Sequence, residues 1–428
     1  MTARPSNPKI VPGAPSAHRE HWYPYYAGYS ATFVQDYLNL LDPEASSLLL
    51  DPWVGSGTTL VEGARAGLKS IGVDLNPAMV VVSKARLLQR SVSESLRPLA
   101  RELIEAALEE DGLDDDPLST WFKSRSTQHW RSIAKGIATV LVPDDSQDLT
   151  KPEHVSRLSS LACFYYVALF RALRRHLTPF GSTNPTWVRV PTDHRRKRGP
   201  SWESISETFV HETELLTADI SGEALFDDDA FEPLVSVGDA RDLSNPCKSV
   251  DIIITSPPYC TRIDYAVATL PELALLGYHR GGHFRELRES LTGSTTIRAS
   301  RPAMDVDWGP KCTTLLERVE KHQSKASRSY YWPQFVQYFS DLFAALSEIG
   351  RILKRGATAV LVVQDSLYKD LHVDLASIVT EMAASRNLEL VRQHHYPASR
   401  SMRRLNPGAR RYDERWSPTE TALEFVAA

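Results

Sequence analysis

Short apolar-rich runs recur along the chain and alternate with longer segments in which apolar residues repeat at helical spacing. The runs are residues 48–50, 70–74, 234–237, 250–254 and 358–363. Runs without polar alternation are typical of strands buried on both faces of a parallel sheet. Apolar positions in 335–352 trace one helical face, which Lys354, Arg355 and Gly356 are predicted to close. The pattern predicts an α/β fold with a doubly wound, mostly parallel sheet, in which 388–391 and 422–426 pair as an antiparallel end.

The same pattern divides the chain into segments. Residues 1–45 form an N-terminal segment, and its first twenty residues are polar and proline-rich, which favours a flexible arm. Residues 46–90 and 233–428 carry the predicted sheet. Residues 91–232 repeat leucines at helical spacing and are predicted to form a mainly helical insertion. Residues 281–330 are polar and charged, and are predicted to be a loop excursion from the core.

A glycine turn follows the first apolar run, in the sequence Asp51-Pro52-Trp53-Val54-Gly55-Ser56-Gly57-Thr58-Thr59. Thr59 and Glu62 have the spacing of a capping box, and Gly67 is a plausible helix stop. The next run ends at Asp74, about twenty residues after the glycines, a spacing that places a carboxylate against ribose hydroxyls. The third glycine of a dinucleotide fingerprint would fall on Leu60, and no phosphate-binding lysine motif occurs at this turn. The turn therefore favours a nucleoside cofactor without phosphates, and S-adenosylmethionine is the obvious one.

A second motif, Thr255-Ser256-Pro257-Pro258-Tyr259, follows the apolar run 250–254. The two prolines end the strand ladder and hold the chain extended at the carboxyl edge of the sheet. The Ser256 hydroxyl and the Pro257 carbonyl are then paired acceptors beside the ring of Tyr259. Such a corner suits an exocyclic amino group on a ring that stacks against the tyrosine. A tight surface turn is the alternative interpretation, and the buried strand before the motif favours the functional one.

Four polar side chains fall at the ends of predicted strands, namely Asp51, Asp74, Asp239 and Ser256. In open α/β sheets, ligands bind outside the carboxyl ends of the strands. The four positions are therefore expected to converge on one crevice. An acid after a strand is also a common helix cap, so the assignment of Asp239 has that alternative.

The two motifs resemble those of S-adenosylmethionine-dependent amino-group DNA methyltransferases. Residues 51–59 are similar to the D-P-F-x-G-S-G-T-T cofactor motif of that family, 72–77 to the G-x-D-x-N-P after it, and 255–259 to its T-S-P-P-Y catalytic motif. Residues 22–27, which include Tyr25 and Tyr26, resemble the H-P-Y-x-A stretch that often precedes the cofactor motif. The resemblance covers roughly half of the chain, by motifs whose context is what confirms them.

The resemblance implies a role for each motif residue. Asp51 serves the methionine end of the cofactor, Asp74 its ribose and Asp239 its adenine end, while Gly55 and Gly57 allow close backbone approach. Pro52 and Thr58 belong to the same cofactor motif. Ser256, Pro257, Pro258 and Tyr259 act on the target base after it is flipped out of duplex DNA.

Within the family, a serine at the first position of the catalytic motif goes more often with the N4 amine of cytosine than with the N6 amine of adenine. The expectation is therefore a site-specific cytosine-N4 DNA methyltransferase. An adenine-N6 enzyme, an RNA amino-methyltransferase and a catalytically silent DNA-binding subunit remain alternatives. Many T-S-P-P-Y enzymes carry that motif ahead of the glycine motif, and this chain has the reverse order. Residues 91–232, aided by 281–330, are expected to recognise the target.

The overall charge does not by itself indicate a nucleic-acid-binding protein, because the net charge is only −4 over 428 residues. A nucleic-acid surface must then be a local patch. The candidates for contacts with duplex DNA are Arg195, Arg196, Lys197, Arg198, Arg403 and Arg404. Solvated charged faces are the alternative interpretation of both clusters.

The four cysteines are scattered and form no metal-binding pair, so no metal is expected. Cys260 is expected to be a bystander, because no basic neighbour activates it in the sequence. No apolar run reaches membrane-spanning length, and a cytoplasmic monomer or dimer is expected. A separately encoded restriction endonuclease or phage-defence partner is what the family implies.

Overall fold

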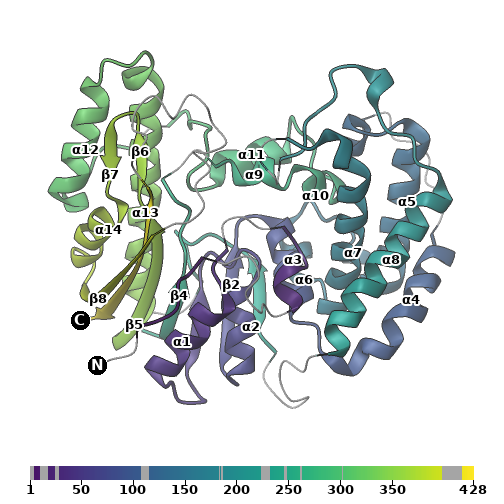
Figure 1. Cartoon of the computed structure of the whole chain (residues 1–428), viewed down its shortest axis with the longest axis horizontal. Coiled ribbons are helices and arrows are strands. Elements are labelled where there is room, and N and C mark those ends of the chain that lie inside the picture. Colours follow the sequence, from purple (N-terminus) through teal and green to yellow (C-terminus); the bar gives the residue numbers. More distant parts are fainter. Residues whose placement is uncertain are drawn as a thin grey trace.

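Seven strands form one sheet in the order β3-β2-β1-β4-β5-β9-β8 within the residues that the structure describes (Figure 1). The strands are β1 (Leu48–Asp51), β2 (Lys69–Asp74), β3 (Leu234–Val237), β4 (Val250–Thr255), β5 (Leu353–Gln364), β8 (Leu388–Pro397) and β9 (Thr419–Ala427). The first five are parallel, and β9 runs antiparallel to both β5 and β8. The predicted doubly wound, mostly parallel sheet with an antiparallel end is confirmed. A hairpin of β6 (Ser366–Tyr368) and β7 (Leu371–Val373) stands apart from this sheet.

The structure is a computed structural model. The residues that it describes are 4–9, 18–24, 28–107, 115–182, 184, 187–222, 232–244, 248–260, 263–300, 302–397 and 417–428. The helices of the sheet domain are α1 (Ala31–Leu41), α2 (Thr58–Arg65), α3 (Pro77–Arg86), α9 (Tyr265–Ala268), α10 (Leu270–Leu275), α11 (His283–Ser290), α12 (Gly309–Lys321), α13 (Trp332–Ile352) and α14 (Leu375–Ala384). The insertion contributes α4 (Ser93–Glu105), α5 (Ser124–Leu141), α6 (Pro152–Arg157), α7 (Ser160–Leu177) and α8 (Trp202–Ser221).

Helices cover both faces of the sheet, because successive side chains of a strand point to opposite sides. Ile252 and Ile254 of β4 pack in the cluster that contains α1, whereas Ile253 between them packs in the cluster of α12, α13 and α14. Leu49 and Leu50 of β1 divide in the same way. Burial on both faces explains why these strands appear in the sequence as continuous apolar runs.

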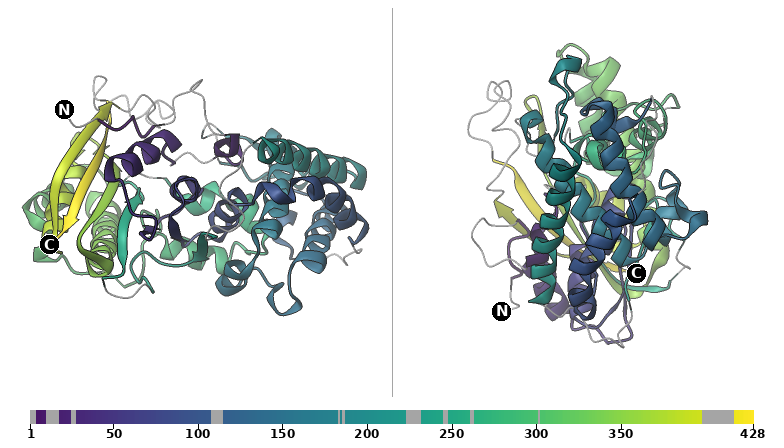
Figure 2. Two further views of the ribbon diagram at one scale, coloured as in Figure 1. Left: turned by 90° about the horizontal axis from the view of Figure 1, so that it is seen from below. Right: turned by 90° about the vertical axis from the view of Figure 1, so that its right-hand side faces the viewer.

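The insertion forms a helical layer beside the sheet domain. Figure 2 shows it at the end of the molecule opposite to β8 and β9. Its core is continuous with α3, since Val80 and Val81 share one buried cluster with Phe164, Phe170 and other residues of the insertion. In the described part of 91–232, the predicted helical character is confirmed. Among the helices of the described ranges, none is both long and apolar enough to cross a bilayer.

Four local predictions are wrong. Residues 281–330 are not a loop, because they contain α11 and also α12, whose Leu315, Leu316 and Val319 are buried in the core. The cations after α13 do not close that helix, since β5 begins at Leu353 and the chain bulges between its pairings with β4. Residues 4–9 of the expected flexible arm are hydrogen-bonded to the domain, as described below.

The fourth wrong prediction is the capping box of Thr59 and Glu62 at the start of α2. Gly57 occupies the cap position, and no side chain caps this helix. The Thr59 hydroxyl instead donates to the Ile254 carbonyl at 3.1 Å, and Glu62 accepts from Gln35 at 2.6 Å. A tertiary contact has thus replaced the local capping box. The helix stop is as predicted, with Gly67 at a φ of 72° directly after Ala66.

Candidate functional site

One cavity lies at the carboxyl ends of β1, β2 and β4. It is lined by Gly28, Tyr29, Pro52, Trp53, Val54, Gly55, Ser56, Thr58, Asp74, Leu75, Asn76, Met79, Gly238, Ala240, Ser256, Pro257, Pro258, Tyr259, Tyr265, Leu291 and Thr292. The glycine turn and the serine–proline motif, which are about two hundred residues apart in the sequence, therefore meet at one crevice, as ligand sites in open α/β sheets do. Of the residues predicted for the site, Asp51, Gly57 and Asp239 are not part of this wall.

The glycine turn is fixed by its neighbour strand. The Val54 amide donates to the Val73 carbonyl, and the Gly55 amide donates to Oδ2 of Asp74, both at 2.9 Å. Gly55 has a φ of 50° and Gly57 a φ of 86°, a backbone region that favours glycine. A Cβ on Gly57 would clash with the Ser83 hydroxyl of α3. Gly57 thus lets α3 pack against the turn, while Gly55 faces the cavity.

Asp74 is the acid at the cavity wall. Its Oδ1 accepts from the Asn76 amide at 2.8 Å, and its Oδ2 accepts from Gly55. Burial raises the pKa of Asp74 to about 6, while the hydrogen bonds from Asn76 and Gly55 oppose that rise. Each carboxylate oxygen retains a second lone-pair direction that can accept a ligand hydroxyl.

Asp51 lies behind the wall and is only 1% exposed. Its Oδ1 accepts from the Thr255 hydroxyl at 2.6 Å and from the Trp53 amide at 3.1 Å, and its Oδ2 accepts from the Tyr29 hydroxyl at 3.0 Å. Burial raises the pKa of Asp51, and these hydrogen bonds lower it. The carboxylate therefore orients two cavity-lining residues, Trp53 and Tyr29, rather than facing the cavity itself.

The serine–proline corner is held by long-range hydrogen bonds. The Ser256 hydroxyl donates to the Val362 carbonyl of β5 at 3.0 Å, and Tyr338 of α13 donates to the Pro258 carbonyl at 2.8 Å. The described residues place no donor on the Pro257 carbonyl. With its proton directed at Val362, the Ser256 oxygen presents lone pairs elsewhere. Ser256 and Pro257 are thus two acceptors at one corner.

Asp239 is engaged by a neighbour. Its carboxylate pairs with the Arg241 guanidinium at 2.7 Å, and Arg241 also contacts Asp341 of α13 at 2.7 Å. The residues on either side, Gly238 and Ala240, line the cavity. This part of the cavity wall therefore consists of the backbone of Gly238 and the methyl group of Ala240. The Asp239 carboxylate is directed toward Arg241 instead.

Sequence reasoning missed Arg86. This arginine of α3 is only 2% exposed, and its Nη1 donates to the Ser56 carbonyl at 2.5 Å and to the hydroxyls of Ser56 and Thr58 at 3.2 and 3.3 Å. Burial lowers its pKa to about 10, so it is still a cation at neutral pH. The available signal in the sequence was two basic residues, Lys84 and Arg86, in the last turn of a helix whose first six residues are apolar.

The predicted DNA-contacting residues lie elsewhere. Arg195 and Arg196 are exposed in a short 3-10 turn, His194–Arg196, between α7 and α8, and Arg195 pairs with Asp193 at 3.1 Å. This segment is at the top of the insertion in Figure 1. Lys197 and Arg198 follow in the same segment. Arg403, Arg404, Tyr25 and Tyr26 lie outside the described residues.

Two further expectations concern cysteine and metal. Burial raises the pKa of the Cys260 thiol, which therefore stays protonated at neutral pH. Across the described stretches of the chain, no group of three or more histidine, cysteine or acidic side chains is placed to hold a metal ion.

The chain is similar in sequence to three bacterial proteins. The type II methyltransferase M.MvaI of Kocuria varians is 26% identical over 399 residues, which cover 87% of this chain and 82% of that protein. The type II methyltransferase M.AvaI of a Nostoc strain is 22% identical and covers 85% of this chain and 77% of its own length. M.BsoBI of Geobacillus stearothermophilus is 23% identical over 66% of this chain and 57% of its own length. No family model matches the chain.

Among solved structures, a SAM-dependent methyltransferase from Methanosarcina mazei aligns with a TM-score of 0.31 and 8% identity over 90% of this chain and 94% of its own. A geranyl diphosphate methyltransferase in complex with GPP and sinefungin aligns with a TM-score of 0.32 and 10% identity over 93% of this chain and 78% of its own. The fold assignment rests on the sheet order and strand directions given above.

Proposed function

We propose that this chain is a site-specific DNA methyltransferase that transfers a methyl group from S-adenosylmethionine to the N4 amine of cytosine in duplex DNA. One observation carries the proposal: the glycine turn with Asp74 and the corner at Ser256 line the same cavity. A cofactor held by the first would lie directly beside a base held by the second. The similarity to proteins named type II methyltransferases over most of the chain supports the same activity.

The cavity fits the cofactor. Asp74 has lone pairs for ribose hydroxyls, and Gly55 approaches without a side chain. The apolar side chains of Leu75 and Met79 suit an adenine ring between them and the backbone at Gly238. When bound, S-adenosylmethionine supplies an electrophilic methyl group on a sulfonium. Residues of the chain would bind the cofactor, hold the target amine and orient it toward that methyl group.

The amine of cytosine is a weak nucleophile, because its lone pair is delocalised into the ring. Ser256 and the Pro257 carbonyl would accept its two N–H bonds and favour a pyramidal nitrogen whose lone pair faces the methyl group. Tyr259 would stack on the flipped base. Preorganised polar contacts of this kind each contribute about 10²–10³ in rate.

The deciding experiment is mass spectrometry of nucleosides from unmethylated genomic DNA incubated with the purified protein and S-adenosylmethionine. N4-methylcytosine supports the proposal in full. N6-methyladenine would keep the chemistry and overturn the base assignment, which rests on the serine at position 256. No methylated DNA base, with cofactor binding intact, would favour an RNA substrate or a silent DNA-binding subunit.

Target recognition is assigned to the insertion, residues 91–232, with the exposed arginines between α7 and α8 as phosphate contacts. Their exposure on the surface of the insertion suits contacts with the phosphates of duplex DNA. We also propose that the protein acts in restriction–modification or phage defence, together with a separately encoded nuclease.

A further inference from the structure

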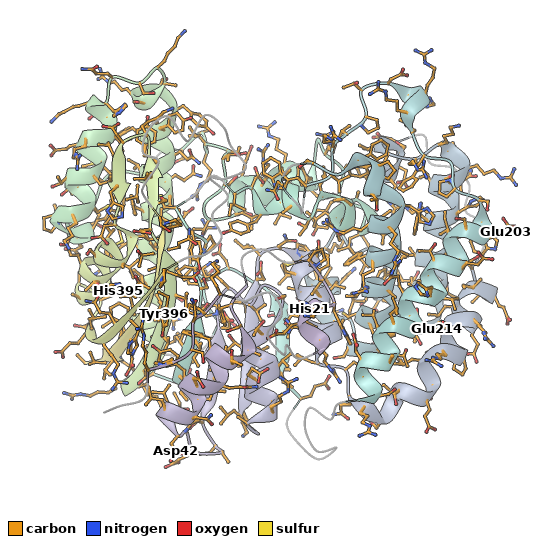
Figure 3. All side chains as sticks on the ribbon, in the orientation of Figure 1. His21, Asp42, Glu203, Glu214, His395 and Tyr396 are labelled. Atoms are coloured by element: carbon orange, nitrogen blue, oxygen red, sulfur yellow. The ribbon has the colours of Figure 1, made fainter. Side chains whose placement is uncertain are left out.

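The segment 4–9 is tied across α1 and β8. The Pro5 carbonyl accepts from the Tyr396 hydroxyl at 2.7 Å, and the Pro8 carbonyl accepts from the Ser30 amide at 2.8 Å. The Ser6 amide donates to Asp36 of α1 at 2.7 Å. Figure 3 labels Tyr396 and its neighbour His395 on β8, within the strand side of the molecule. These anchors fix the path of the segment up to its last described residue.

That residue, Lys9, lies at the catalytic corner. Its Nζ is 3.1 Å from Oε1 of Glu420 and 5.6 Å from the centroid of the Tyr259 ring. The side chain of Lys9 is 12% exposed and that of Glu420 is 2% exposed. A buried carboxylate is normally paired with a cation, and here the cation comes from the opposite end of the chain.

Glu420 in turn holds Tyr259. Its Oε1 accepts from the Tyr259 hydroxyl at 2.7 Å, while Oε2 has no hydrogen-bond partner among the described residues. The Tyr259 hydroxyl is also 3.3 Å from the Ser256 hydroxyl. Ser256 is the donor of that contact, so the Tyr259 oxygen accepts from Ser256 while its own proton goes to the carboxylate.

Hydrogen-bond direction decides what Ser256 can offer to a substrate. An ionised carboxylate only accepts, so it takes the Tyr259 proton, and the Val362 carbonyl likewise takes the Ser256 proton. Both protons then point away from the base, and the lone pairs of Ser256 remain available to an incoming amine. Without Glu420, the Tyr259 hydroxyl would donate to Ser256 and occupy one of those lone pairs.

We propose that Glu420 and Lys9 are positioning residues for the methyl transfer proposed above, on which this inference rests. Glu420 directs the Tyr259 proton away from Ser256, and Lys9 holds the carboxylate oxygen that does so. Neither residue touches the substrate. The N-terminal segment thereby becomes part of the active site through one ion pair.

Glu420→Met tests the first role, because methionine keeps the volume and removes the acceptor. We expect kcat on unmethylated genomic DNA to fall about tenfold, with KM for DNA and cofactor Kd close to the wild type. The thermal midpoint should fall, because Lys9 loses its buried counter-ion. Glu420→Gln retains an acceptor oxygen at the same place and should keep kcat within about threefold. Glu424→Met is the matched control, since Glu424 is buried on the same strand and pairs with Arg392 instead, at 3.4 Å.

A double-mutant cycle separates proton direction from packing. In a Tyr259→Phe background there is no hydroxyl to redirect, so adding Glu420→Met should change kcat by less than about twofold. A further fall of about tenfold in that background would overturn the inference. Lys9→Met should lower kcat about threefold, and Lys9→Arg should restore it. Arg4 holds the same segment through the His395 carbonyl of β8, so Arg4→Met is the control and should leave kcat unchanged.

The controls keep two failures distinct. Wild-type methyl transfer with an unaffected Glu420→Met variant would overturn this inference alone. Absence of methyl transfer by the wild type would overturn the proposed function and this inference with it.

Discussion

The Thr255 hydroxyl donates a 2.6 Å hydrogen bond to Oδ1 of Asp51, which joins the end of β4 to the end of β1. Both groups are buried, and they connect the two motifs that line the cavity. Thr255→Val keeps the shape and leaves a buried carboxylate without one of its donors. We expect a decrease of about 1–3 kcal/mol in the free energy of unfolding, measured by urea denaturation.

Thr217→Val is the control for that decrease. Thr217 is also buried, but its hydroxyl donates to the Thr213 carbonyl of its own helix, at 2.7 Å. A change within about 1 kcal/mol is expected there. Equal decreases in the two variants would refute a special role for the bond between Thr255 and Asp51.

Ser256→Ala should lower the rate of methyl transfer about 10²–10³-fold, because it removes one of two acceptors for the target amine. Cofactor affinity, measured by calorimetry, should stay within about twofold of wild type, since Ser256 serves the base in this proposal. Ser347→Ala on α13 removes a hydroxyl bonded to the Phe343 carbonyl at 2.8 Å and should leave both quantities unchanged. A parallel fall of affinity and rate at position 256 would contradict the assignment.

Asp74 should make cofactor binding depend on pH. Burial raises its pKa to about 6, and only the ionised carboxylate accepts from both ribose hydroxyls. Affinity is therefore expected to be constant above about pH 7 and to weaken as pH falls through about 6, by up to about tenfold per pH unit. Titration calorimetry at several pH values measures this.

Asp74→Asn is the control for that pH dependence. The variant should bind more weakly at neutral pH and should show a flat profile across about pH 5–7, since the amide does not titrate. If Asp74→Asn kept the same pH dependence of cofactor affinity as the wild type, Asp74 would be excluded from the ribose site.

Gly57→Ala should destabilise the protein by about 2–4 kcal/mol. The left-handed φ of 86° costs an alanine about 1 kcal/mol, and the clash with Ser83 adds about 1–3 kcal/mol of overpacking. Gly67→Ala at the other end of α2 is a matched variant, because its φ is 72° and its Cβ would meet nothing within 4 Å. It should cost only about 1 kcal/mol, and similar costs in the two variants by thermal unfolding would refute the steric part.

Replacing Arg195, Arg196 and Arg198 together by glutamine should flatten the salt dependence of DNA binding. Removal of one phosphate-binding cation reduces the slope of log K against log salt by about 0.9. Arg90, Arg97 and Arg101, which are exposed at or on α4, form a control of equal charge. An identical slope in the first variant would exclude the segment between α7 and α8 from the interface.

The sequence by itself determined the strands of the seven-stranded sheet, the helices α2 and α13, the helical character of the insertion and the two motifs. Continuous apolar runs mark buried strands, and the turn chemistry of Gly55 and of the two prolines is local. It also determined that Asp74 at the end of one strand and Ser256 directly after another share an edge of one sheet. The helices α11 and α12 are not evident in the sequence, because charged residues interrupt their short apolar faces.

Tertiary structure decided which motif residues face the cavity and what holds them. Asp51 ends a strand as Asp74 does, and Asp239 lies two residues after β3, yet Thr255 and Arg241 engage these two acids away from the wall. Glu420 reaches Tyr259 across 161 residues, and Lys9 reaches Glu420 from the other end of the chain. Local periodicity specifies backbone conformation and burial, whereas the partner of a buried polar group depends on which distant segment the fold packs against it.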